Sequence, residues 1–275
     1  MSGSSKSICF SGGNNIPIYI NPDGILVCEN SKFIIPEVVS NVKSVSCGDY
    51  HLCVLLNDGT IRTFFCKFNH IYQPNPIDLP PIESMSCGIF HTSVITTSGK
   101  IISWSNLIER NHKDNYDIYD NSKRAKHISC GFGFTCVIFE NNDYKLIDHI
   151  IKSTNRLPKY FQNVKNVSCS GAYITVLFLD NSVLSFTMLH STFICDERFL
   201  NVKIISSGQY HSVLYRYDKE MISWGSYILN ENFDFDVVDI VCGNQMTCLI
   251  LSNGKVIILS RLKVLFDFSN IVVKI

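Results

Sequence analysis

The chain has 275 residues, of which 46% are hydrophobic and 17% are charged, so it can bury a large core and does not have the composition of a disordered chain. Its 24 lysine and arginine residues balance 24 aspartate and glutamate residues, so no net charge would attract nucleic acid or an anionic membrane. The N-terminus lacks the apolar core of a signal peptide, and no segment approaches the roughly 18 apolar residues that cross a bilayer. These features predict an intracellular protein, cytoplasmic or nuclear.

Seven copies of one sequence pattern follow one another along the chain. The clearest copy is "SVSCGDYHLCVLLNDGTIRTF" at residues 44–64. The repeat cores cover about residues 10–28, 44–64, 84–104, 127–147, 166–186, 204–225 and 240–259. The glycine after the cysteine marks the period at Gly13, Gly48, Gly88, Gly131, Gly208 and Gly243, with Ser170 in its place in the fifth copy. Successive markers are 35 to 43 residues apart, a spacing typical of stacked repeat units.

Each copy predicts three strands in the same order. In residues 44–64 a short apolar strand stops at Cys47-Gly48, an alternating strand follows, and a third strand runs back after a tight turn. We expect a type I′ turn, which needs positive φ at its central residues and therefore favours Gly or Asn. Six of the seven copies have Gly or Asn at the second turn position, but the sixth copy has Asp218-Lys219, for which we expect a different turn.

The segments between the repeat cores leave room for a fourth strand and loops. Units of three or four antiparallel strands must stack to be stable, and seven of them suit a closed ring, because closure removes exposed strand edges. The C-terminal "FSNIVVKI" (268–275) resembles "FQNVKNVS" (161–168) and "FLNVKIIS" (199–206), which open other copies. The sequence thus predicts an all-β chain, a single seven-bladed β-propeller domain over residues 1–275, closed by pairing of the N- and C-terminal strands.

The repeat resembles that of the regulator of chromosome condensation (RCC) family. The resemblance rests on the Cys-Gly pair, the histidine three residues after the glycine, the Asp-Gly turn and the closing Trp224-Gly225, and it extends over all seven copies. The glycine-rich segment that usually follows Trp-Gly in the family is missing, so this is a divergent member with shortened repeats. The family resemblance implies a propeller fold. It also implies, as one activity of family members, nucleotide exchange on a small GTPase of the Ran type.

The recurrent histidines and cysteines are expected to be structural. His51, His91 and His211 occupy one repeat position, and a catalytic residue would not be replicated in three blades, so we expect each imidazole to hydrogen-bond inside its own blade. Most cysteines also recur at two repeat positions and are expected to be small buried side chains. No zinc-ligand spacing occurs, and blades hold equivalent positions apart, so no metal site is expected. Disulfides are also not expected in an intracellular protein, because the cytosol keeps thiols reduced.

No phosphate-binding or nucleophile motif occurs, so the sequence predicts no enzyme, no catalytic residue and no cofactor. Function in propellers normally resides in the loops on the two ring faces. The longest segment between cores, 105–127, mixes charge with tyrosines and can be a partner-binding rim or a solvated loop; 153–163 is a second candidate. The candidate partner-binding residues are Arg110, His112, Lys113, Tyr116, Tyr119, Lys123, Arg124, Arg156, Lys159 and Tyr160.

Two functions remain open at this point. The first is a non-enzymatic protein–protein interaction module, a scaffold or adaptor. The second is a guanine nucleotide exchange factor-like regulator of a small GTPase. Alanine occurs only at Ala125 and Ala172, a bias typical of AT-rich coding sequences, so we expect a source such as an amoeba, a parasite or a large DNA virus. A parasite or viral origin would make host proteins the expected targets, and a viral protein would also be a candidate for association with the virion.

Overall fold

The computed structural model describes residues 7–10, 17–28, 33–66, 78–105, 117–119, 122–148, 160–171, 173–187, 199–225, 230–232, 236–244 and 246–260. In these ranges every regular element is a strand, which confirms the all-β prediction. None of the described segments forms a helix long and apolar enough to cross a membrane.

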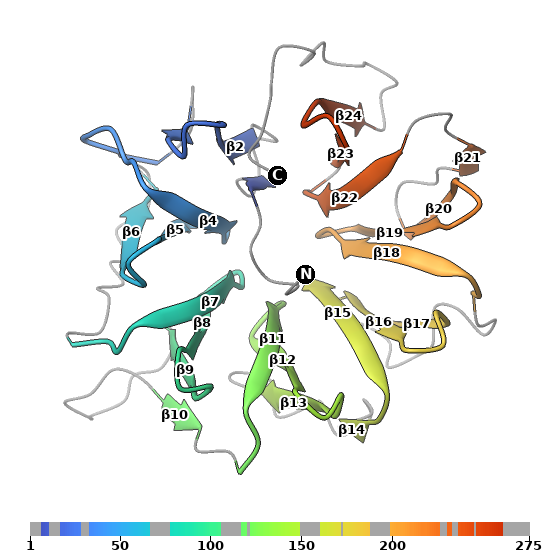
Figure 1. Cartoon of the computed structure of the whole chain (residues 1–275), viewed down its shortest axis with the longest axis horizontal. Helices are drawn as coiled ribbons and strands as arrows, with labels where there is room; N and C mark the ends of the chain where they lie inside the picture. Colours follow the sequence, from blue (N-terminus) through green and yellow to red (C-terminus); the bar gives the residue numbers. More distant parts are fainter. Residues whose placement is uncertain are drawn as a thin grey trace.

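Seven antiparallel sheets form the blades of a ring, so the predicted propeller architecture is confirmed (Figure 1). Within the described residues, three blades have four strands and four have three. The first strand of each blade lies nearest the ring axis; these are β1 (Ile8–Phe10), β4 (Val42–Cys47), β7 (Ile82–Cys87), β11 (Ala125–Cys130), β15 (Val164–Ser170), β18 (Val202–Ser207) and β22 (Val237–Cys242). We number the blades 1 to 7 in this order.

The other strands follow outward in chain order. The second strands are β2 (Pro17–Ile20), β5 (His51–Leu56), β8 (His91–Thr96), β12 (Phe134–Phe139), β16 (Tyr173–Phe178), β19 (His211–Arg216) and β23 (Met246–Leu251). The third strands are β3 (Leu26–Val27), β6 (Ile61–Phe65), β9 (Ile101–Ser105), β13 (Tyr144–Asp148), β17 (Val183–Thr187), β20 (Glu220–Gly225) and β24 (Val256–Ser260). The fourth strands of blades 3, 4 and 6 are β10 (Asp117–Tyr119), β14 (Tyr160–Phe161) and β21 (Asn230–Asn232).

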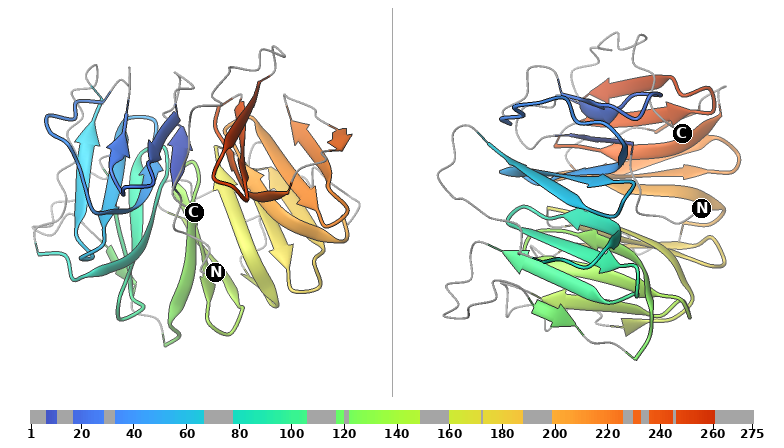
Figure 2. Two further views of the ribbon diagram at one scale, coloured as in Figure 1. Left: turned by 45° about the horizontal axis from the view of Figure 1, so that its top comes forward. Right: turned by 60° about the vertical axis from the view of Figure 1, so that its left-hand side comes forward.

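This strand order gives the ring two different faces (Figure 2). The loops between the first and second strands, such as residues 48–50, reach one face, which we name the loop face. The hairpin turns between the second and third strands, such as residues 57–60, reach the opposite face, which we name the turn face. Any side chain can therefore be assigned to a face from its place in the repeat.

The hairpin turns differ from the predicted type. The second turn residue has positive φ, as at Gly59 (φ 86°) and Asn142 (φ 64°), but the residue before it does not. The hydrogen bond from Gly59 N–H to the Leu56 carbonyl closes a type I turn followed by a left-handed residue, so the type I′ prediction is wrong. The expected exception is also wrong, because Lys219 adopts the same left-handed conformation (φ 70°) and donates the equivalent hydrogen bond to Arg216.

The core lies between the blades, because each blade packs face to face against two neighbours. Strand β5 is buried at all six positions. Its side chains alternate, so that Leu52 and Val54 pack with blade 1, whereas Cys53 and Leu55 pack with blade 3. A strand buried on both faces needs a continuous apolar run, which is why "HLCVLL" lacks the polar alternation of a surface strand.

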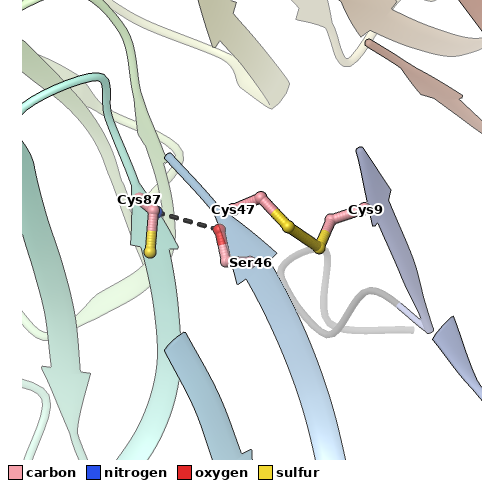
Figure 3. Close-up of a disulfide and its surroundings, with 4 residues drawn as sticks. All are labelled: Cys9, Ser46, Cys47 and Cys87. Atoms are coloured by element: carbon pink, nitrogen blue, oxygen red, sulfur yellow. Dashed lines mark hydrogen bonds between the residues drawn. A yellow bond between two sulfur atoms is a disulfide. The ribbon is translucent and has the colours of Figure 1, made fainter. Parts of the chain in front are cut away.

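A repeated hydrogen bond joins neighbouring first strands around the axis. At five blade boundaries the backbone N–H of one residue donates to the hydroxyl of a serine in the preceding blade, as from Cys87 to Ser46 (2.9 Å). In β1, Cys9 occupies the strand position that Ser46 occupies in β4. Instead of accepting a hydrogen bond, Cys9 forms a disulfide with Cys47 (Figure 3). The expectation of unpaired, buried thiols is therefore wrong for this pair, and a covalent bond joins blades 1 and 2 where serine joins the others.

Blade 7 packs against blade 1 and completes the ring of described blades. Ile8 and Phe10 of β1 share one apolar cluster with Val241 of β22 and Met246 of β23. No hydrogen-bonded pairing of terminal strands is described, because residues 268–275 lie outside the described residues. Closure by terminal strands therefore stays a prediction.

Candidate functional site: the loop face

The loops on the loop face are short and closed by the same backbone bond in successive blades. Gly48 N–H donates to the His51 carbonyl (2.8 Å), and the equivalent bond forms in blades 3, 4, 6 and 7. A Cβ added to Gly48 would lie 2.4 Å from the Gly88 carbonyl oxygen and 2.6 Å from the His51 ring, so no larger residue fits. We name these segments the Cys-Gly loops; their backbone bonds and close packing make them rigid.

In blades 2, 3 and 6 a histidine follows the Cys-Gly loop and binds the next blade. His51, His91 and His211 are buried, and their Nε2 atoms hydrogen-bond to threonine hydroxyls one blade further on, at distances of 2.8, 3.0 and 2.9 Å. The contacts fit the expected structural role, but these Nε2 bonds join two blades, whereas the sequence predicted bonds inside one blade. The threonine partners are Thr92, Thr135 and Thr247.

This pairing has a sequence signal. A histidine in one repeat is followed, in the next repeat, by a threonine directly after the equivalent position: "HT" at 91–92, "FT" at 134–135 and "MT" at 246–247. Phe134 and Tyr173 replace the histidine in two repeats, and the repeats after them have Ile174 and Ser212 in place of the threonine. Comparison of successive repeats could therefore have identified the contact.

The Cys-Gly loops place aromatic side chains on the loop face. Tyr50 stacks on Phe90, with ring centroids 5.6 Å apart and an interplanar angle of 21°. Phe90 meets Phe132 edge to face at 5.7 Å. Tyr50 and Phe132 are each 40% exposed, so blades 2, 3 and 4 carry one continuous, half-exposed aromatic row. We name Tyr50, Phe90 and Phe132 the aromatic row; Tyr210 of blade 6 is a further exposed aromatic on this face, at 45%.

A cavity of about 410 Å³ lies on the ring axis next to the aromatic row. The first strands of all seven blades line it, mostly with serine, cysteine and small apolar side chains. At the loop face its lining includes Asp49, Ile89, Gln209 and Asn244. Asp49 carries the single formal charge in the described Cys-Gly loops, so this part of the loop face is close to neutral.

Two of the predicted partner-binding residues lie on the opposite face. Lys123 and Arg124 precede β11 on the turn face. Lys123 pairs with Asp143, and Arg124 bridges Glu83 (2.8 Å) and Glu140 (3.2 Å). These side chains thus form ion pairs within the protein, one of them between blades 3 and 4.

Of the other predicted residues, the structure locates two by backbone only. Tyr119 ends β10 and Tyr160 begins β14, at the outer edges of blades 3 and 4. The remaining predicted residues lie outside the described residues: Arg110, His112, Lys113, Tyr116, Arg156 and Lys159. The sequence does not single out the aromatic row, because its members lie within the repeat cores, between the Cys-Gly pair and the second strand.

A second unexpected cluster lies beneath the aromatic row. The ligand atoms of His51, Cys53 and Cys87, which come from different repeat positions, lie within 4.8 Å of one another in the buried boundary of blades 2 and 3. The expectation that blades keep such groups apart is wrong here, because it compared only equivalent positions. A hydrogen bond with Cys87 lowers the pKa of the Cys53 thiol, whereas burial raises the pKa of Cys87 well above its usual value.

Residues 42–64 match the family model described as "Regulator of chromosome condensation (RCC1) repeat". This match confirms the predicted resemblance to the RCC1 repeat, and it covers 23 of the 275 residues. No curated protein matches the sequence.

Solved structures resemble nearly the whole chain. Prp20p from Saccharomyces cerevisiae has a TM-score of 0.64 at 11% identity, with 92% of this chain and 80% of that chain covered. The CRINKLY WD40 ectodomain of the Arabidopsis thaliana receptor kinase ACR4 has a TM-score of 0.69 at 16% identity, with 94% and 98% covered. Human WBSCR16 has a TM-score of 0.63 at 13% identity, with 87% and 85% covered. At these identities the likeness shows the fold.

Proposed function

We propose that the chain is a non-enzymatic protein-binding module, a scaffold or adaptor that holds a partner on its loop face. The observation that carries this proposal is the aromatic row, three rings in mutual contact that remain partly exposed beside the axial cavity. Contiguous exposed aromatic surface is uncommon on a monomer and is typical of protein interfaces.

The loops that carry the row favour binding at low entropic cost. Gly48 and Gly88 each close their loop with a backbone hydrogen bond, and the ring contacts order the side chains before a partner arrives. Less conformational freedom is then lost on association. The low formal charge of the described Cys-Gly loops suits a partner with a neutral, apolar contact surface.

The test is affinity capture of partners from native or host-cell extract, quantified by mass spectrometry. Substitution of both Tyr50→Ser and Phe132→Ser should abolish recovery, because truncation of one central interface aromatic costs about 2 kcal/mol, or about 30-fold in affinity. Tyr217→Ser is the matched control, since Tyr217 is 52% exposed on the turn face. Loss of the partner only in Tyr217→Ser would contradict binding on the loop face.

The segment at 105–127 stays a second candidate contact surface. Replacement of residues 106–116 by a short Gly-Ser linker, which keeps β9, β10 and β11, tests it in the same capture experiment. Loss of the partner in this variant, with retention in the double serine variant, would assign binding to the segment and not to the aromatic row.

The alternative function is exchange-factor-like regulation of a small GTPase. It is supported by the RCC1-type repeat and by the likeness to Prp20p, whose structure is described with binding to Gsp1p and histones. The described Cys-Gly loops carry one acidic residue, Asp49, and no acidic cluster that would match a basic GTPase surface. Capture of a small GTPase, stronger without nucleotide, followed by accelerated nucleotide release, would establish this alternative.

A further inference from the structure

The boundary between blades 2 and 3 contains a compact group of soft ligands. His51 and Cys53 point from β5, and Cys87 lies at the end of β7. The three side chains are buried, with exposures of 3%, 0% and 8%. The Thr92 hydroxyl lies among them, 2.8 Å from His51 Nε2, 3.6 Å from Cys53 Sγ and 3.9 Å from Cys87 Sγ.

The same four positions exist at other boundaries, but their chemistry differs. The boundary of blades 3 and 4 has serine at the Cys53 position, and the boundary of blades 6 and 7 has valine there; the sets are His91, Ser93, Cys130, Thr135 and His211, Val213, Cys242, Thr247. Blades 4 and 5 bring together the thiols of Cys136 and Cys169, but Phe134 replaces the histidine. Among the described residues, two thiols and an imidazole therefore meet at one boundary, between blades 2 and 3.

We propose that His51, Cys53 and Cys87 bind one Zn²⁺ ion, with the Thr92 hydroxyl as the fourth ligand. Zinc prefers thiolate and imidazole ligands in a tetrahedron with bonds of about 2.0–2.3 Å, so its ligand atoms stand roughly 3.3–3.8 Å apart. The contacts of 2.8, 3.6 and 3.9 Å around Thr92 are near this range. The ligand atoms of His51, Cys53 and Cys87 lie up to 4.8 Å apart, so they would move together by about 1 Å on binding the ion. The charges of the ligands also suit a buried site, because two thiolates neutralise Zn²⁺ and leave no net charge.

The proposed ion would link two neighbouring blades below the aromatic row. It would join β5 to β7 directly below Tyr50 and Phe90, which follow the Cys-Gly pairs of the same two blades. Metal binding would therefore stabilise the part of the ring that carries the stacked half of the aromatic row. Without the ion, the same atoms form a hydrogen-bonded cluster, as at the boundary of blades 3 and 4, and the experiment must separate these two states.

The experiment uses the full chain, purified without oxygen and without reductant so that the Cys9–Cys47 disulfide stays intact, and freed of metal with a chelator. Zn²⁺ is titrated in competition with a chromophoric chelator, and Co²⁺ is added separately to detect thiolate-to-cobalt charge transfer. We expect one equivalent of Zn²⁺, the charge-transfer band, and a higher melting temperature with zinc. Mg²⁺, a hard cation that prefers oxygen ligands, should have no effect.

Two variants make the test specific. Cys53→Val introduces the residue that blade 6 has at the equivalent position, so it should fold, and it should lose the equivalent of zinc and the cobalt band. Cys136→Ser removes a thiol from the other thiol pair and should keep both. Failure of the wild type to bind zinc, or unchanged binding in Cys53→Val, would overturn the proposal; neither result bears on partner capture at the aromatic row.

Discussion

Loss of the Cys9–Cys47 disulfide should reduce the stability of the ring by a predictable amount. The bond closes a loop with a sequence separation of 38 residues. The chain-entropy relation for a loop of this length gives about 13 cal/mol/K, or about 4 kcal/mol at 25 °C. Cys9→Ser places serine at the register of Ser46, where it can accept the Cys47 N–H and recover about 1 kcal/mol. We therefore expect a net loss of about 3 kcal/mol.

Guanidinium unfolding of oxidised wild type, reduced wild type and Cys9→Ser measures this loss. Reduction should lower the stability of the wild type and leave that of Cys9→Ser unchanged. Cys28→Ser is the control, since the Cys28 thiol is outside the disulfide, and it should keep the response to reductant. Alkylation of all 12 cysteines without reduction, or equal unfolding midpoints for Cys9→Ser and oxidised wild type, would refute the reasoning.

Three further predictions concern stability. Burial lowers the pKa of His211 to about 4 from 6.5, so the unfolded chain binds more protons between these pH values. The free energy of unfolding should therefore fall by up to about 3 kcal/mol as the pH drops from 6.5 to 4. In urea unfolding at these pH values, His211→Phe should show a fall smaller by this amount. Gly208→Ala should cost about 1–3 kcal/mol, because its Cβ would lie 2.1 Å from the Gly243 carbonyl oxygen; an unchanged denaturation midpoint would argue against this close packing. Lys219→Gly should raise the melting temperature by about 2 °C, because Lys219 has a φ of 70° and glycine relieves about 1 kcal/mol of left-handed strain; a lower melting temperature would contradict the turn geometry.

The repeat allowed the fold to be predicted in some detail. The Cys-Gly pair and the Gly or Asn of the hairpin recur in most copies, and an apolar second strand lies between them, so the repeat predicts the strand order and the number of blades. The turn type was not predictable from the same residues, because a left-handed Gly59 fits both a type I′ turn and a type I turn with a bulge.

Contacts between blades were harder to predict than contacts within them. The bond from His51 to Thr92 crosses 41 residues, and a local pattern does not reveal which face of a strand meets the next blade. The meeting of Cys53 with Cys87 was missed for the same reason, since the two residues stand at different repeat positions. The aromatic row depends on the distance between neighbouring loops, which the ring geometry sets.

Photo-crosslinking in native extract tests the proposed binding face most directly. A photoreactive phenylalanine analogue is placed at Phe132 on the loop face and, in a second variant, at Tyr217 on the turn face. The proposed function predicts a partner adduct from position 132 and none from position 217. An adduct from position 217 alone would contradict it and assign binding to the turn face.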